Sequence, residues 1–149
     1  MTEMQIRTMT PEDYDRVRSL WMSCRNMGFN NLDDSREGIG RFLKRNPDTS
    51  FVCEDGGRII GVVLAGHDGR RGLIYHTCVA EDRRGEKIAS RLVEHALEAL
   101  KAEGIHKVAL VVFTRNEAGN AFWESQGFTA RNDLVYRNKA LADMERIDT

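Results

Sequence analysis

The sequence lacks both a surplus of charge of one sign and any long hydrophobic run. Its formal net charge is −1, with 22 Lys and Arg against 23 Asp and Glu, so no basic field favours nucleic acid as a partner. No apolar run is long enough for a transmembrane helix, and the N-terminus has no hydrophobic signal segment. We therefore expect a protein that binds neither nucleic acid nor membranes, with a cytoplasmic location.

Cysteine is scarce, and the number of cysteines is odd. Cys24, Cys53 and Cys78 lie in apolar contexts without a C-x-x-C pair, which favours buried thiols in a reducing compartment over disulfides. The four histidines, at positions 67, 76, 95 and 106, have no metal-ligand spacing, so we expect no metal site. The sequence also lacks the G-x-G-x-x-G pattern of dinucleotide sites and the G-x-x-x-x-G-K-[ST] pattern of phosphate-binding loops.

What the chain does contain is a regular alternation of strand and helix patterns, without a long linker or an internal repeat. Short β-branched or alternating runs predict strands at 5–9, 50–54, 59–66, 73–79, 107–113, 128–131 and 134–139. Helical spacing and capping residues predict helices at 11–24, around 39–43, at 88–104 and at 117–126, with a loop at 26–34. This order predicts one α/β (α+β) domain over residues 1–141, with a mixed sheet of about seven strands and helices on both faces, followed by a polar C-terminal tail at 142–149.

The segment Arg83-Arg84-Gly85-Glu86-Lys87-Ile88-Ala89-Ser90 joins the strand predicted at 73–79 to the helix predicted at 88–104. A strand that turns into a helix leaves several unpaired N–H groups near one point, and the helix dipole adds positive potential there. The segment therefore predicts an anion site, most naturally for phosphate. An ordinary turn with solvated charges is the alternative interpretation.

Two partial motifs in this chain resemble those of the GNAT (Gcn5-related N-acetyltransferase) superfamily. The segment Arg84-Gly85-Glu86-Lys87-Ile88-Ala89 matches the first and last positions of the acyl-CoA signature, with Lys87 in place of the middle glycine. Downstream, Asn116, Phe122-Trp123 and Gly127-Phe128 follow the family's later pattern at the family's spacing. The N-terminal residues and the turn at 66–72 further resemble small bacterial YpeA-like and ribosomal-protein-alanine acetyltransferases.

The resemblance implies a single GNAT-type domain whose mostly antiparallel sheet has splayed central strands. It also implies that acetyl-CoA is the cosubstrate, with its pyrophosphate on the backbone amides of residues 84–90 and its pantetheine arm beside Val79. If φ of Lys87 is positive, we expect the affinity for acetyl-CoA to suffer. The cofactor-binding residues implied in this way are Cys78, Val79, Arg84, Gly85, Glu86, Lys87, Ile88, Ala89, Ser90, Asn116 and Trp123.

Acetyl transfer needs a neutral amine, donors for the developing oxyanion and an acid for the departing thiolate. The family's tyrosine acid is replaced here by Trp123, whose indole donates a hydrogen bond but no proton, so we expect it to pack. Tyr75 and Tyr136 are candidate acids, although the thiolate can also leave unprotonated, and His76 is a candidate base. Tyr75 and His76 face opposite sides of a regular strand, so only one faces the cleft unless a bulge re-aims them. A hydrogen-bonded histidine without a catalytic role is the alternative for His76.

The resemblance also bears on the acceptor substrate. The resemblance places it between residues 24–36 and 129–136, where Asp33 and Asp34 could attract an amine. The predicted function is transfer of acetyl from acetyl-CoA to a primary amine, of a small molecule or of a peptide or protein N-terminus, by direct attack. The alternatives are a catalytically silent acyl-CoA-binding module and an interaction domain, and an exposed sheet edge would allow a homodimer.

Overall fold

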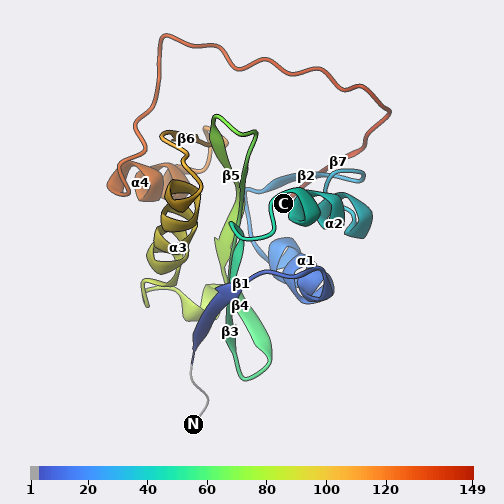
Figure 1. Ribbon diagram of the computed structural model, residues 1–149, viewed down its shortest axis with the longest axis vertical. Coiled ribbons are helices and arrows are strands. Elements are labelled where there is room, and N and C mark those ends of the chain that lie inside the picture. Colours follow the sequence, from blue (N-terminus) through green and yellow to red (C-terminus); the bar gives the residue numbers. More distant parts are fainter. Residues whose placement is uncertain (1–3) are drawn as a thin grey trace.

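The computed structural model describes residues 4–149, and its centre is a five-stranded sheet (Figure 1). Neighbouring strands are antiparallel except β5 and β6, which are parallel. This arrangement confirms the mixed, mostly antiparallel sheet. The strands follow the order β1 (Gln5–Thr8), β3 (Phe51–Asp55), β4 (Arg58–His67), β5 (Gly72–Val79) and β6 (Val108–Ala109).

Helices cover both faces of the sheet, as the alternation of elements predicts. Two lie on one side and two on the other (Figure 1). None of the helices within residues 4–149 has the length and apolar character needed to cross a bilayer. The first side carries α1 (Tyr14–Ser23) and α2 (Arg36–Arg45), the second α3 (Ile88–Ala102) and α4 (Glu117–Ser125), and the short 3-10 turns η1 (Pro11–Asp13) and η2 (Glu81–Arg83) precede α1 and α3.

The core lies on the two faces of β4, which contacts both α1 and α3. Residues 59–66 of this strand are all buried, so the strand reads as an almost continuous apolar run. Val17 and Trp21 cover it from α1, and Leu92 covers it from α3. The buried core residues of the described chain all lie between Met9 and Ile105.

A second, two-stranded sheet corrects the loop predicted at 26–34. Within that segment, β2 (Gly28–Asn30) pairs antiparallel with β7 (Arg146–Asp148), which lies in the segment predicted as a polar tail. Just beyond this pairing, the backbone N–H of Thr149 donates to the carbonyl oxygen of Met27 at 2.8 Å. Such a short strand depends on hydrogen bonds from a distant segment, and its own residues carry little strand signal.

The C-terminal third departs furthest from the predicted strands. The strand predicted at 107–113 is paired only at Val108 and Ala109, and the segments 128–131 and 134–139 form no strand. Residues 129–145 instead run as an exposed, extended segment from α4 back to β7 (Figure 1). An alternating pattern makes a strand only where a neighbouring strand accepts its hydrogen bonds, and this segment has no such neighbour. The seven strands therefore divide into five and two.

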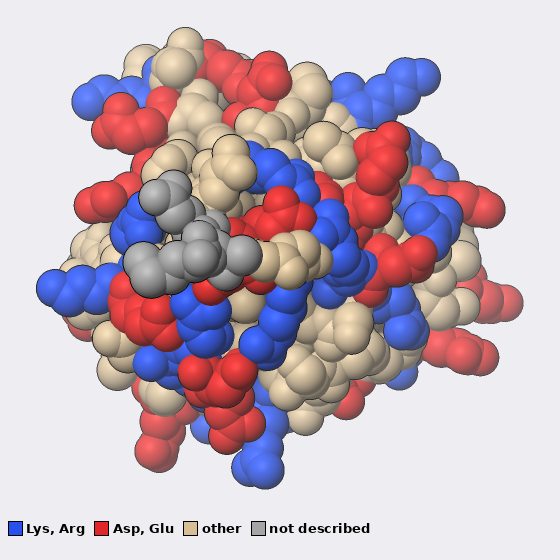
Figure 2. All heavy atoms as spheres, turned by 90° about the horizontal axis from the view of Figure 1, so that it is seen from below, with Lys and Arg blue, Asp and Glu red and all other residues tan. Residues whose placement is uncertain are grey.

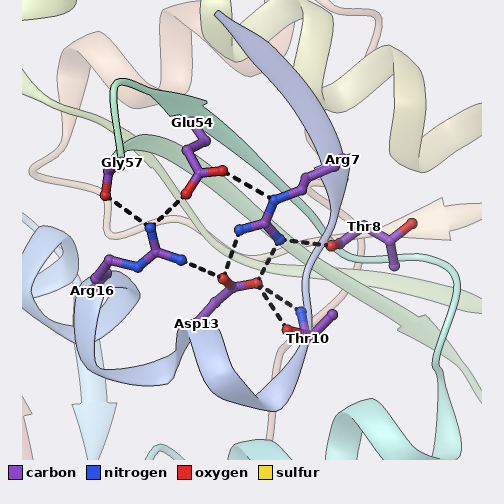
Figure 3. A network of polar contacts seen from close by, with 7 residues as sticks. All are labelled: Arg7, Thr8, Thr10, Asp13, Arg16, Glu54 and Gly57. Carbon is purple, nitrogen blue, oxygen red and sulfur yellow. Dashed lines mark hydrogen bonds and ion pairs between the residues drawn. The ribbon is translucent and has the colours of Figure 1, made fainter.

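A network of ion pairs ties the N-terminal strand to the first helix and to β3 (Figure 3). The buried carboxylate of Asp13 accepts hydrogen bonds from Arg7 at 2.7 and 2.9 Å and from Arg16 at 2.9 Å, and both arginines also reach Glu54. Burial raises the pKa of Asp13, but the hydrogen bonds from Arg7 and from the N–H of Thr10 outweigh it, so the pKa is lowered. On the face seen in Figure 2, positive and negative side chains are interspersed rather than gathered by sign.

Candidate active site

The turn between β5 and α3 presents free backbone donors. The N–H of Arg91 donates to the carbonyl oxygen of Lys87 at 3.1 Å, so the three preceding N–H groups, of residues 88–90, have no acceptor within the helix. Gly85 has φ +84°, and a Cβ placed on it would meet nothing within 4 Å, so the turn is open to an approaching group. This arrangement suits a phosphate or diphosphate at the N-terminus of α3.

Lys87, the residue that departs from the family signature, adopts a left-handed conformation. It is the N-cap of α3, with φ 61° and ψ 24°. This conformation costs a non-glycine residue about 1–2 kcal/mol, which explains why a glycine is usual at this position. Because this φ is positive, we expect acetyl-CoA to bind more weakly than it would with a glycine at this position.

The positive charges of the turn divide into paired and unpaired ones. Arg83 is bound by Asp55 at 2.8 Å and by Glu86 at 2.8 Å, so its charge is largely compensated. Arg84 and Lys87 have no carboxylate partner among residues 4–149. These two cations therefore remain available to an anionic ligand.

An open groove leads from this turn along the outer edge of β5. The parallel pairing of β5 and β6 is limited to Gly72 with Val108 and Leu73 with Ala109. Beyond these residues the two strand segments separate. This separation confirms the splayed central strands. The groove brings together six of the predicted cofactor-binding residues, namely Cys78, Val79, Arg84, Ala89, Asn116 and Trp123.

The remaining predicted cofactor-binding residues lie in the turn beside the groove. The side chain of Glu86 bonds to Arg83, and that of Ile88 is buried in the core, so both would offer a ligand only their backbone N–H. Ser90 accepts a hydrogen bond from Gln126 at 3.2 Å, which ties α3 to the end of α4.

A bulge in β5 turns both Tyr75 and His76 towards the groove. The pairing with β4 shifts between Val62 and Leu64, and His76 has φ +40°, which is rare for a residue other than glycine. The rings of Tyr75 and His76 lie 6.2 Å apart, and both line the groove. Because of the bulge, both side chains line the groove, whereas a regular strand would place them on opposite faces of the sheet.

The two tyrosines predicted as acids have different surroundings. Burial raises the pKa of Tyr75, whose ring meets Phe42 edge-on at 5.9 Å. Tyr136 lies on the extended segment and is 70% exposed. Tyr75 is therefore the one held in place by packing.

His76 is enclosed by residues that sequence reasoning did not connect with it. Its Nε2 lies 2.6 Å from Oδ1 of Asp34, and its ring centroid lies 5.0 Å from Trp21 and 4.6 Å from Phe29. The Nε1–H of Trp21 also donates to the carbonyl oxygen of His76 at 3.1 Å. Asp34 is 42 residues away in the chain, and no local sequence pattern predicts this pairing.

The family of the chain follows from comparison with known proteins. The sequence model of the acetyltransferase (GNAT) family matches residues 14–128. The chain belongs to this family. An acetyltransferase of Pectobacterium atrosepticum is 31% identical over 142 residues, covering 95% of this chain and 99% of that protein.

Solved structures agree with the GNAT fold. The aminoglycoside N-acetyltransferase AAC(6')-Iy in complex with CoA has a TM-score of 0.71 at 18% identity, covering 93% of this chain and 96% of that one. A ribosomal-protein-alanine N-acetyltransferase from Brucella melitensis biovar Abortus 2308 has a TM-score of 0.66 at 18% identity, with 93% and 100% covered. The predicted family, fold and acyltransferase class are confirmed.

In this GNAT domain, Trp123 packs as expected. Its ring centroid lies 5.0 Å from Phe122 and 5.2 Å from Phe128, and the side chain rests against the core. Asn116 begins the same helix, because its Oδ1 accepts the N–H of Gly119 at 2.9 Å. Asn116 and Trp123, which both belong to the later GNAT motif, therefore shape α4 where it borders the groove.

A pair of thiols near Val79 is a further feature that the sequence did not predict. Cys24 ends α1, and its Sγ donates to the carbonyl oxygen of Val79 at 3.8 Å. A hydrogen bond with Cys78 lowers the pKa of Cys24 to about 7 despite burial, and the charge of Arg84 contributes. The same interaction, together with burial, raises the pKa of Cys78.

Proposed function

We propose that this protein transfers the acetyl group of acetyl-CoA to a primary amine by direct attack. The acceptor is a small molecule or the N-terminus of a peptide or protein. The observation that carries the proposal is the set of free backbone N–H groups at residues 88–90, in a turn that opens onto the groove beside β5.

The turn and the groove match two parts of acetyl-CoA, its pyrophosphate and its pantetheine arm. The N–H groups of residues 85–90 would hold the pyrophosphate, with Arg84 and Lys87 adding positive charge. Beyond Leu73, the groups of β5 that face β6 have no strand partner in the described chain, so they can pair with the amides of the pantetheine arm. The thioester would then lie near Val79 and the bulge in β5.

The chemistry assigns separate tasks to the groups at the bulge. The amine nitrogen bonds to the acetyl carbon, the carbon–sulfur bond breaks, and the thiolate of CoA leaves. A base must take the amine proton, and His76 is the candidate for this role. Tyr75 or Tyr136 could protonate the thiolate, which can also leave as the anion.

A thiol-release assay with acetyl-CoA and a panel of primary amines tests the proposal. The panel includes amino acid amides, short peptides with free N-termini, and polyamines. We expect CoA release that depends on at least one amine. Binding of acetyl-CoA in a calorimeter, without release for any amine, would instead indicate a catalytically silent module.

A matched pair of variants links this activity to the turn. Ala89→Asp places a carboxylate beside the proposed pyrophosphate site at the N-terminus of α3, where an acid is tolerated by the helix dipole. Ala102→Asp makes the same change at the other, exposed end of α3. We expect only the first variant to lose acetyl-CoA binding, and equal binding by both would contradict the assignment.

The location of the protein in the cell is a separate proposal. We propose that it is cytoplasmic, because Cys24, Cys53 and Cys78 are all free thiols.

A further inference from the structure

We infer that Asp34 is a positioning residue that fixes the tautomer of His76 and thereby makes Nδ1 of His76 the base of the reaction. The inference rests on the proposed acetyl transfer. It concerns an aspartate in the loop before α2, which the sequence suggests only as an attraction for the amine.

Asp34 is itself held through its carboxylate and through its backbone carbonyl. Its Oδ2 accepts the backbone N–H of Asn30 at 2.8 Å, and its backbone carbonyl accepts the hydroxyl of Tyr14 at 2.7 Å. With Oδ2 engaged by a fixed donor, Oδ1 faces Nε2 of His76 at 2.6 Å. An ionised carboxylate only accepts hydrogen bonds, so Nε2 carries the proton.

The other ring nitrogen of His76 is then a free acceptor. Nδ1 has no hydrogen-bond partner among the described residues. Every fully buried side-chain nitrogen or oxygen of these residues does have a partner, so Nδ1 is not fully buried and is accessible. The side chains of His76 and Asp34 are only 14% and 11% exposed, and His76 lines the groove. The basic lone pair thus lies in the wall of the groove, on a ring whose other nitrogen is fixed.

The backbone at His76 is arranged to hold this ring in place. A positive φ at a residue other than glycine is strained and persists only where the surroundings impose it. Here the Nε1–H of Trp21 holds the carbonyl of His76, and the rings of Trp21 and Phe29 enclose the imidazole. The bulge, this hydrogen bond and the two rings together fix the imidazole beside the groove.

The proton balance of the step is complete. As the amine attacks and CoA leaves as the thiolate, one amine proton passes to Nδ1 of His76, and the resulting imidazolium is stabilised by the carboxylate of Asp34. The other ionisable groups around the pair are Tyr75 on β5, Asp33 beside Asp34, and Tyr14 on α1. Tyr14 is flanked by Arg18 and Arg36.

Nitrogen NMR of the ¹⁵N-histidine-labelled protein tests the positioning without any acceptor. At about pH 8.5, where an ordinary imidazole is neutral, we expect His76 to be the Nε2–H tautomer. In Asp34→Asn, the remaining oxygen keeps the N–H of Asn30 while the new amide donates to Nε2, so the Nδ1–H tautomer should gain. Asp15→Asn is the control, because it changes an exposed carboxylate whose ion-pair partner among residues 4–149 is Arg36 alone.

Kinetics with the best amine from the panel test the consequence for catalysis. Asp34→Asn should lower kcat at least about tenfold while the KM for acetyl-CoA stays within about twofold, because general bases contribute about 10²–10⁴-fold. Asp34→Glu should recover part of the rate, and Asp15→Asn should behave as the wild type.

The outcomes separate this inference from the proposed function. An Nδ1–H tautomer in the wild type, or an unchanged kcat in Asp34→Asn, would overturn the role of Asp34 while leaving acetyl transfer intact. Absence of turnover with every amine would overturn the proposed function and the base role together, whatever the tautomer.

Discussion

Lys87 offers a test of the turn in which conformation and charge can be separated. Lys87→Gly removes both the strain of the left-handed conformation and the ammonium group, whereas Lys87→Ala removes only the ammonium group. A non-glycine residue at φ 61° costs about 1–2 kcal/mol, and the greater freedom of glycine in the unfolded chain offsets about 0.4–1 kcal/mol. The glycine variant should therefore be more stable than the alanine variant by about 0.5–1 kcal/mol.

Urea unfolding and thermal melting measure this difference. For a chain of this length, the expected gain corresponds to a rise in Tm of about 1–4 °C. Calorimetry with acetyl-CoA should show Lys87→Ala binding about two- to fivefold more weakly than the wild type, because it loses a surface cation and keeps the strained conformation. The glycine variant should bind at least as tightly as the alanine variant. A glycine variant less stable than the alanine variant would refute the left-handed conformation.

Two further predictions concern the buried carboxylate and the thiol pair. Asp13→Asn should lose about 1.5–3 kcal/mol in urea unfolding, because it weakens the charge-assisted hydrogen bonds from two arginines that still keep Glu54. The lowered pKa of Asp13 means that its contribution is present above the unfolded pKa of about 3.9 and is lost as the pH falls below it, so wild type and variant should converge in acid. Iodoacetamide should modify Cys24 before Cys53 and Cys78, and the rate of modification of Cys24 should have its pH midpoint near 7. CoA should slow this reaction. Earlier labelling of Cys78 would contradict the assigned order of thiol pKa values.

Local chemistry in the sequence was enough to predict most of the fold. Asn116 caps α4 as its position before a helical run indicates, and the hairpin of β3 and β4 follows from alternating apolar residues around a glycine turn. The free backbone donors at the start of α3 were also predictable, because the first turn of a helix leaves its N–H groups without acceptors.

Features that depend on distant partners were beyond sequence reasoning. The strand β2 exists because β7 pairs with it, and the bulge at His76 depends on Trp21 from α1. The pairing of Asp34 with His76 has no local signal, so the sequence could name His76 but could not say which nitrogen is free. Conversely, the alternation at 134–139 suggested a strand for which this structure supplies no neighbour.

A crystal structure of the complex with acetyl-CoA tests most directly whether residues 85–90 hold the pyrophosphate beside the open edge of β5. We predict pyrophosphate oxygens about 2.7–3.2 Å from the backbone nitrogens of this turn, with the thioester near Val79 and Nδ1 of His76 facing the acetyl group. Acetyl-CoA bound with its pyrophosphate away from the N-terminus of α3 would contradict the account.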